Sequence, residues 1–298
     1  MFRKYLYKKA IPSLLITTLL FACTKDDTGN NNNNSGSSSL PERIIIDTSY
    51  GIHSRNKMDI YLPAKRDNKT RLIVFIHGGA WVAGDKTDFN SYITQMRNKW
   101  PEAAIANINY RYASNTANIH YNEMMSDISS AVQFLVNNKT AFSISDTAAM
   151  VGASAGAHMA MLYTYAYNTD GKIRCVADIF GPSVLNDWDW YNSYNLWLGA
   201  TAGEFIKTFA GAPWNEDLYK SLSPYTRATA ASKPTIIFHG TADVIVPLYQ
   251  SQWLAARLNT LGVPNQYVEY ALDGHGFNST NTNDCLNKIV AFFKTHCK

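Results

Sequence analysis

From residue 43 onward, short apolar stretches of strand-like composition alternate with stretches of helical periodicity. The stretch 71–79 (RLIVFIHGG) is a continuous apolar run ending in two glycines, as expected of a strand buried on both faces. This alternation predicts an α/β fold, with a mostly parallel sheet, helices on both of its faces and right-handed crossovers. The expected strands are 43–52, 57–63, 71–79, 103–112, 147–154, 173–182, 233–240 and 266–272, and the expected helices are 121–138, 155–167, 249–262 and 283–296.

Length and composition predict one globular domain over residues 41–298. The chain has 298 residues, 46% hydrophobic and 17% charged, which excludes disorder for most of it. The stretch 183–222 interrupts the alternation and holds four of the seven tryptophans, so we interpret it as an inserted lid. These tryptophans either form a ligand surface or fill the lid's own core; they are Trp188, Trp190, Trp197 and Trp214.

The first 22 residues have the features of a secretory signal peptide. Four basic residues within 1–9 precede an apolar run, 10–22, that is too short for an ordinary membrane-spanning helix. The run ends in LFAC (20–23), which resembles a bacterial lipobox, and the resemblance implies cleavage before Cys23 and lipidation of that cysteine. Residues 23–40, rich in Asn, Ser and Gly, are expected to form a flexible linker. The KDD sequence at 25–27 resembles the surface-export signal of Bacteroidetes lipoproteins, which implies a lipid-anchored protein of the bacterial outer membrane, exposed at the cell surface.

The charge balance gives no argument for a nucleic-acid partner. The formal net charge is +4, but four of the basic residues belong to the predicted signal peptide. The rest of the chain is therefore formally neutral, whereas nucleic-acid-binding domains are usually basic.

Three cysteines remain once Cys23 is assigned to the lipid: Cys175, Cys285 and Cys297. The last two lie twelve residues apart on one expected helix, about 18 Å along its axis. A disulfide needs Cα atoms within about 7 Å, so this pair would require the helix to break. Cys175 could pair with either of the others if the fold allowed it, and we predict free thiols. The sequence contains no CxxC or His/Cys cluster, and we predict no metal site.

The strongest chemical motif is GASAG at 152–156, a G-x-S-x-G pattern between an expected strand and an expected helix. That context is the one in which a nucleophilic serine is presented on a tight strand-to-helix turn. The glycines two positions before and after Ser154 avoid a clash across the turn. The start of the helix favours developing negative charge. We therefore predict that Ser154 is a nucleophile.

A serine hydroxyl needs a general base, and His275 is the best placed of the seven histidines. It follows the last expected strand and lies between two glycines that allow its loop to approach the serine.

The base needs an acid that fixes its tautomer, and Asp243 directly follows another apolar strand. The chain order Ser154, Asp243, His275 is that of α/β-hydrolases. The competing acids are Asp178, Asp187, Asp189 and Asp273.

Acyl transfer also needs N–H donors for the oxyanion. One is the backbone N–H of Ala155, directly after the serine. The others are expected from the loop HGGAW at 77–81, where Gly78 and Gly79 let the backbone approach the substrate. Whether Gly78 and Gly79 or Gly79 and Ala80 supply these N–H groups stays open at this stage.

Five pieces of the chain together resemble an α/β-hydrolase esterase with an HGGxW loop: FIHGGAW, INYRY, GASAGAH, HGTADVIVP and GHGF. The resemblance covers about residues 56–295 and points to feruloyl and acetyl carbohydrate esterases and to hormone-sensitive-lipase-like esterases. The loop departs from the HGGG of many relatives, and Ala153 stands where lipase-like relatives often have an acidic residue. The resemblance implies ester hydrolysis without a cofactor. We expect substrate contacts from Trp81, Trp188 and Trp190.

The function predicted from the sequence is a serine ester hydrolase acting on short or aromatic acyl esters. Surface anchoring and an aromatic lid favour small esters or acylated polysaccharides as substrates, as in acetyl or feruloyl carbohydrate esterases. Two alternatives remain. HGGxW loops also occur in kynurenine formamidases, which cleave an amide. The chain could also be a non-catalytic surface binding lipoprotein, because fold alone does not fix function.

Overall fold

The computed structural model describes residues 40–193, 195–197 and 199–297, and in this part eight strands form one sheet. The strand order is β1-β2-β4-β3-β5-β6-β9-β10. All neighbours from β4 to β10 are parallel, whereas β1 and β2 are antiparallel, which confirms the predicted mostly parallel sheet. The strands are β1 (Arg43–Ser49), β2 (Lys57–Leu62), β3 (Leu72–Ile76), β4 (Ala104–Ile108), β5 (Ala148–Ala153), β6 (Ile173–Ile179), β9 (Thr235–Gly240) and β10 (Asn265–Tyr270).

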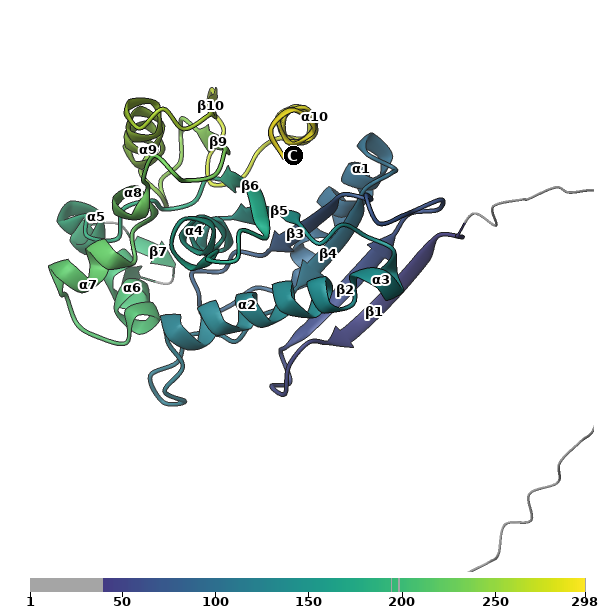
Figure 1. Cartoon of the computed structure of the whole chain (residues 1–298). Coiled ribbons are helices and arrows are strands. Elements are labelled where there is room, and N and C mark those ends of the chain that lie inside the picture. Colours follow the sequence, from purple (N-terminus) through teal and green to yellow (C-terminus); the bar gives the residue numbers. More distant parts are fainter. Residues whose placement is uncertain (1–39, 194, 198, 298) are drawn as a thin grey trace, which may run out of the picture. The chain divides into compact units, whose positions relative to one another are not determined.

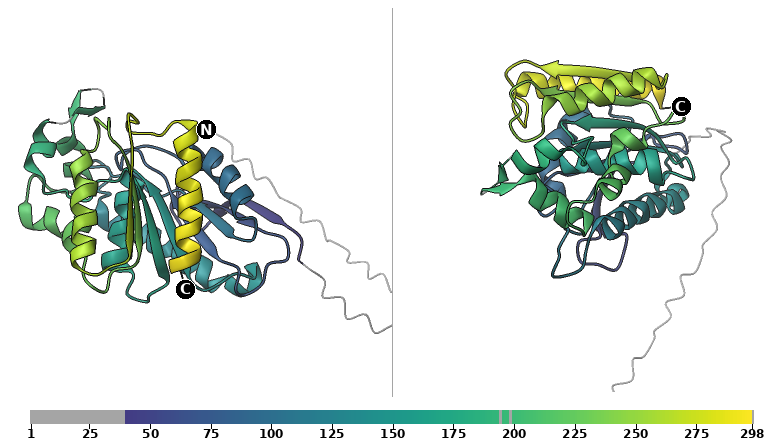
Figure 2. Two further views of the ribbon diagram at one scale, coloured as in Figure 1. Left: turned by 90° about the horizontal axis from the view of Figure 1, so that it is seen from above. Right: turned by 90° about the vertical axis from the view of Figure 1, so that its left-hand side faces the viewer.

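Helices cover both faces of the sheet, because successive strand side chains point to opposite sides (Figures 1 and 2). In β3, Val74 packs toward one helix layer and Phe75 toward the other. One layer contains α2 (Tyr121–Asn137), α4 (Ala155–Leu162) and α9 (Leu248–Thr260). The other contains α1 (Asn90–Lys99) and α10 (Ser279–His296), which lie side by side. A short helix, α3 (Lys139–Phe142), follows α2.

Several helix boundaries differ from those expected. A 3-10 turn, η1 (Lys86–Phe89), and α1 occupy a stretch for which no helix was predicted. The expected helix 155–167 is α4 followed by a π-helical turn, η2 (Tyr163–Tyr167). Helix α10 starts four residues earlier than expected, because the side chain of Asn278 accepts a hydrogen bond from the Asn281 N–H and caps the helix.

The segment between β6 and β9 includes the stretch predicted as a lid. It contains α5 (Trp188–Ser193), β7 (Asn195–Trp197), β8 (Ala200–Thr201), α6 (Ala202–Ala210), α7 (Glu216–Ser221) and α8 (Pro224–Arg227). Four aromatic rings of this segment pack together, with centroids 4.7–5.9 Å apart: Trp188, Tyr191, Trp214 and Tyr219. Helix α8 contacts both α4 and α9, so the segment packs against the helix layer that contains α2, α4 and α9.

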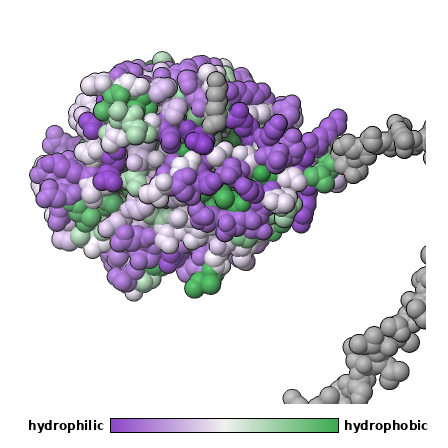
Figure 3. All heavy atoms as spheres, in the orientation of Figure 1, coloured by the Kyte–Doolittle hydropathy of each residue, from purple (hydrophilic) through white to green (hydrophobic). Residues whose placement is uncertain are grey.

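The face of the molecule in Figure 3 is mostly hydrophilic, with small separated hydrophobic spots. Among the described residues, no helix is both long and apolar enough to cross a membrane. Cys175, Cys285 and Cys297 are all buried free thiols. The predicted signal peptide, Cys23 and most of the linker lie outside the described residues.

Candidate active site

Ser154 occupies a tight turn between β5 and the first residue of α4. Its backbone has φ +53° and ψ −125°, a strained combination for a residue with a side chain. Its N–H donates to the backbone oxygen of Ile179 at 2.9 Å, which holds the turn against β6. The flanking glycines are required sterically. A Cβ on Gly152 would lie 2.4 Å from the backbone oxygen of Gly156, and one on Gly156 would lie 2.1 Å from a backbone oxygen at the end of β3.

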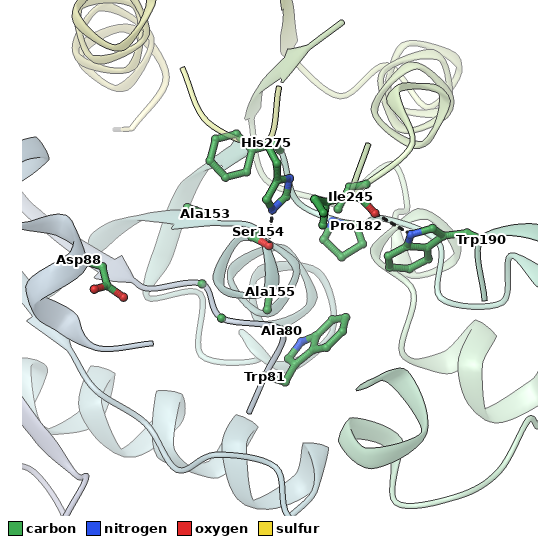
Figure 4. Close-up of a pocket in the computed structure, with 14 residues that line it drawn as sticks. Ala80, Trp81, Asp88, Ala153, Ser154, Ala155, Pro182, Trp190, Ile245 and His275 are labelled. Carbon is green, nitrogen blue, oxygen red and sulfur yellow. Dashed lines mark hydrogen bonds between the residues drawn. The ribbon is translucent and has the colours of Figure 1, made fainter. Parts of the chain in front are cut away.

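The structure brings His275 and Asp243 to this serine. His275 Nε2 lies 2.8 Å from Ser154 Oγ, and His275 Nδ1 lies 2.7 Å from Asp243 Oδ2. Figure 4 shows the His275 ring pointing at Ser154, above the start of α4. The three residues follow β5, β9 and β10, whose carboxyl ends meet at one edge of the parallel sheet.

Asp243 is held as a carboxylate. Its side chain is fully buried, which by itself would raise its pKa, but hydrogen bonds from His239, His275 and the Val246 N–H outweigh burial and lower the pKa below its usual range. An ionised carboxylate only accepts hydrogen bonds, so His275 Nδ1 carries the proton. His275 Nε2 is then free to accept the Ser154 hydroxyl hydrogen.

The four competing acids are placed elsewhere, and none of them bonds to His275. Asp178 is fully buried in β6, where it accepts from the Gly181 N–H, and burial raises its pKa to about 7. Asp187 accepts from a tyrosine hydroxyl of α9, and Asp189 is exposed on α5. Asp273 binds two asparagines at the start of α10.

A cavity of about 320 Å³ opens over Ser154 and His275. All three predicted oxyanion donors line it, namely Gly78, Gly79 and Ala155, as does Ala80. The loop after β3 packs tightly on the serine turn, since a Cβ on Gly78 would lie 2.9 Å from a backbone oxygen and 3.2 Å from the Ser154 Cβ. The loop also has φ +112° at Gly79, where a side chain would be strained.

The three tryptophans predicted to bind substrate are placed differently. Trp81 and Trp190 line the cavity, although each side chain is almost fully buried. The Trp190 Nε1–H donates to the backbone oxygen of Ile245 at 2.9 Å, which fixes one cavity wall (Figure 4). Trp188 does not line the cavity. Its ring is half exposed and packs on Trp214 within the aromatic cluster of the insertion, because α5 points positions 188 and 190 in different directions.

Some cavity residues were missed by sequence reasoning. Phe180 and Pro182 follow β6, and Ile245 and Val246 follow β9, so proximity to a strand end was the available signal. Asp88 lines the side of the cavity away from Trp190 in Figure 4. It lies in η1, a turn with no apolar periodicity that would have predicted it.

Two buried histidines support the loops around the cavity. His77 Nδ1 lies 2.7 Å from the backbone oxygen of Gly78 and therefore donates to it. The Trp81 Nε1–H donates to His158 Nδ1 at 3.2 Å, and His158 Nε2 lies 2.8 Å from the backbone oxygen of Leu222. Burial lowers the pKa of both imidazoles to about 4, so both are neutral at pH 7. Across residues 40–297 as described, no three His, Cys, Asp or Glu side chains gather as a metal site would require.

Comparison with protein families identifies the one to which this site belongs. The model of the BD-FAE family matches residues 58–258, more than half of the chain and most of the sheet. The chain belongs to the BD-FAE family of α/β-hydrolase esterases. The matched residues of this BD-FAE chain include Ser154 and Asp243, whereas His275 lies beyond the matched range.

Curated relatives of the BD-FAE chain share roughly a quarter of its residues. An isoprenylcysteine alpha-carbonyl methylesterase of Arabidopsis thaliana is 27% identical over 244 residues, covering 76% of this chain and 55% of the relative. Dipeptidyl aminopeptidase BIII of Pseudoxanthomonas mexicana is 28% identical over 246 residues, covering 78% of this chain and 34% of the relative. The chain thus spans about a third to a half of the length of these relatives.

Solved structures share the fold of the BD-FAE chain. A bifunctional GH43-CE protein of Bacteroides eggerthii has a TM-score of 0.71 at 22% identity, covering 85% of this chain and 38% of that one. A truncated carbohydrate esterase from gut microbiota has a TM-score of 0.71 at 18% identity, covering 87% of this chain and 99% of that one. An esterase of Thermogutta terrifontis has a TM-score of 0.67 at 19% identity, covering 85% of this chain and 92% of that one. At these identities the likeness shows the α/β-hydrolase fold.

Proposed function

We propose that the chain is a serine ester hydrolase that removes short or aromatic acyl groups from carbohydrate. The observation that carries this proposal is the continuous hydrogen-bond series from Ser154 Oγ through His275 to the buried carboxylate of Asp243. Membership of an esterase family and esterase relatives support it.

The geometry supports a two-step acyl transfer. Ser154 Oγ attacks the ester carbonyl carbon while its proton passes to His275 Nε2. The imidazolium then gives this proton to the departing alkoxide, and the alcohol leaves an acyl-serine. Water attacks the acyl-serine with His275 again as the base, which releases the acid and restores Ser154. Asp243 remains ionised and stabilises the imidazolium in both steps.

The negative charge on the carbonyl oxygen needs donors on the opposite side from His275. The N–H of Ala155 is the first free donor of α4, where the helix dipole also favours an anion. The Gly78 carbonyl is held by His77 Nδ1 and the Tyr110 hydroxyl, so the Gly79 N–H of the same planar peptide points the other way. We assign Ala155 and Gly79 as oxyanion donors, with either Gly78 or Ala80 completing the set.

The cavity suits a small acyl group. Its volume of about 320 Å³ lies at the lower end of the usual range for ligand sites, about 300–1,000 Å³. The walls formed by Trp81, Trp190 and Phe180 suit an acetyl group or one aromatic ring better than a long lipid chain. The carbohydrate assignment is supported by two structural neighbours, one a carbohydrate esterase and the other a GH43-CE protein.

The test compares the purified chain with its Ser154→Ala variant on acetylated xylan, a feruloyl sugar ester and p-nitrophenyl acetate. We expect acid release by the wild type and a loss of kcat of about 10³-fold or more in the variant. Equal turnover by both proteins would overturn the proposed mechanism. Cleavage of p-nitrophenyl acetate alone would keep the mechanism and reject the carbohydrate substrate.

Adding N-formylkynurenine as a substrate and a fluorophosphonate probe to this experiment separates the two alternatives. Formate release from N-formylkynurenine without ester cleavage would identify an amide hydrolase related to kynurenine formamidases. A non-catalytic binding lipoprotein would cleave none of these substrates, and a fluorophosphonate probe would fail to label Ser154.

We propose that the enzyme is lipid-anchored to the outer membrane through Cys23 and exposed at the cell surface. This rests on the basic and apolar N-terminal stretch, the LFAC sequence and the KDD sequence that follows it. Fatty-acid labelling of the wild type and of Cys23→Ser tests the anchor, and a labelled Cys23→Ser variant would reject it. Protease treatment of intact cells tests exposure, and complete protection would reject a surface location.

A further inference from the structure

His239 is a fully buried histidine that the mechanism above does not use. It is the second-last residue of β9 and begins the HGTADVIVP sequence. Its Nε2 lies 3.2 Å from Asp243 Oδ2 and 3.0 Å from the backbone oxygen of Val246. Its Nδ1 lies 2.7 Å from the Ser251 hydroxyl of α9. Both ring nitrogens are therefore engaged within the protein.

These contacts determine where the His239 proton sits. A backbone carbonyl only accepts hydrogen bonds, so His239 Nε2 must carry a hydrogen to satisfy Val246. The same hydrogen faces Asp243 Oδ2. His239 Nδ1 is then free to accept the hydroxyl hydrogen of Ser251. In this single tautomer, neutral His239 is fully satisfied, as a buried polar side chain must be.

The Asp243 oxygen that holds His275 is thus shared by two imidazoles. Oδ2 accepts from His275 Nδ1 at 2.7 Å and lies 3.2 Å from His239 Nε2, whose hydrogen it shares with the backbone oxygen of Val246. The other oxygen, Oδ1, receives the N–H groups of Ile245 and Val246 at 2.8 and 3.0 Å. Two backbone donors on Oδ1, and His275 with the shared His239 hydrogen on Oδ2, mean that the carboxylate cannot rotate without losing bonds.

We propose that His239 is a positioning residue of the active site, whose Nε2–H is the second donor to the carboxylate oxygen that orients His275. This rests on the proposed serine hydrolase function. His239 has no contact with the reacting atoms. It fixes the Asp243 carboxylate and stabilises its negative charge, and through Asp243 it sets the basicity of the His275–Asp243 pair.

The sign of the effect follows from charge. The active enzyme has neutral His275 beside ionised Asp243, and one added proton makes the pair neutral overall. Asp243 is ionised in both forms, but its charge is balanced by the imidazolium only in the protonated one. Removing a donor therefore destabilises the net-negative form more, so the pair takes up a proton more readily and its apparent pKa rises. The groups facing His239 are Asp243, Asp178 of β6, Glu269 of β10 and the non-titrating Ser251. None of these changes in a His239 variant.

Two substitutions separate the donor from the packing. In His239→Gln, the amide nitrogen falls near the position of Nε2, so a donor to Asp243 is kept. In His239→Asn, the shorter amide reaches Ser251 but not Asp243. We expect the acid limb of kcat/KM for p-nitrophenyl acetate to move up by about 0.5–1 pH unit in His239→Asn. Because kcat/KM falls about tenfold per pH unit below this limb, the shift lowers kcat/KM 3- to 10-fold relative to the wild type there. His239→Gln restores the limb to nearly the wild-type position.

The control is His296→Asn, the same change near the end of α10, which leaves the limb unchanged. A wild-type limb in His239→Asn, or equal shifts in His239→Asn and His239→Gln, would overturn the proposal. Wild-type protein that hydrolyses no ester and resists fluorophosphonate would instead overturn the proposed function, and the role of His239 with it.

A measurement on the wild type covers the case in which the variants do not fold. Long-range ¹H–¹⁵N spectra distinguish the two neutral imidazole tautomers and the imidazolium. We expect His239 to carry a hydrogen on Nε2. The Nδ1–H tautomer, which lacks that hydrogen, would overturn the proposal without any substitution.

Discussion

Replacing Asp243 with asparagine is the most direct test of how the site sets the tautomer of His275. In the wild type Oδ1 accepts hydrogen bonds from the N–H groups of Ile245 and Val246, and Oδ2 accepts one from His275 and faces the His239 Nε2–H at 3.2 Å. All four partners are donors. An amide offers one accepting oxygen and one donating NH₂, so in either orientation its NH₂ faces two donors.

The kinetic consequence follows from this mismatch. When the amide oxygen stays on the backbone N–H groups, its NH₂ faces His275 Nδ1, which must then accept. The His275 proton moves to Nε2, and Nε2 can no longer take the proton of Ser154. A triad histidine in the wrong tautomer costs a serine hydrolase about 10⁴-fold in kcat, and we expect a similar loss here.

The substitution also costs stability. Buried donors left without acceptors cost about 1–3 kcal/mol. The folded pKa of Asp243 is lowered, so its ionisation stabilises the wild type above the unfolded pKa, about 3.9. That contribution is lost as pH falls through the folded pKa, so the difference between wild type and variant shrinks in acid.

The assay is kcat/KM for p-nitrophenyl acetate from pH 5 to 9, together with urea unfolding of both proteins. Asp189→Asn is the matched control, because it makes the same carboxylate-to-amide change on the exposed surface of α5. A folded Asp243→Asn variant within tenfold of the wild-type kcat/KM would refute the assignment of Asp243 as the acid.

Three further predictions concern stability. Gly156→Ala places a Cβ 2.1 Å from a backbone oxygen, so we expect little folded protein, whereas Gly274→Ala, whose Cβ meets only one atom at 3.6 Å, keeps the wild-type Tm in thermal unfolding. Burial lowers the pKa of His77 and His158 to about 4, so between about pH 6.5 and 4 these histidines are protonated only in the unfolded chain. Each should therefore lower the unfolding free energy by about 1.4 kcal/mol for each unit that the pH falls in this range. An unfolding free energy from urea titrations that does not change with pH would contradict this. Trp81→Phe leaves His158 Nδ1 without its donor and should cost about 1–3 kcal/mol in the same measurement, while an unchanged midpoint would show that this bond is dispensable.

The sheet could be predicted from the sequence because its strands are buried on both faces. The stretch 71–79 contains five consecutive apolar residues, LIVFI, and 233–240 contains the apolar core IIF, and a strand buried on both faces has this composition. Helix α1 was missed for the opposite reason. Only Ile93 and Met96 of its ten residues are buried, and two apolar positions do not establish a helical period.

The grouping of Ser154, Asp243 and His275 could also be predicted, because each follows a strand and parallel strands end at one edge. The walls of the cavity could not be predicted in the same way. Trp188 and Trp190 are two residues apart in one short helix, yet only Trp190 reaches the cavity. Which of them does so depends on how the insertion packs against the loop at Ile245, a contact between distant parts of the chain.

The role of His239 could not be predicted from its residue type and its spacing in the sequence. Its place in a buried strand predicts a side chain that fills the core, and burial is what the structure shows. What distinguishes it is the position of one hydrogen, set by the backbone oxygen of Val246 on one side and the Ser251 hydroxyl on the other. Those partners come from a loop and a helix whose approach depends on tertiary packing. The charge of Asp243, and with it the tautomer of His275, therefore depends on contacts that no local pattern in the sequence encodes.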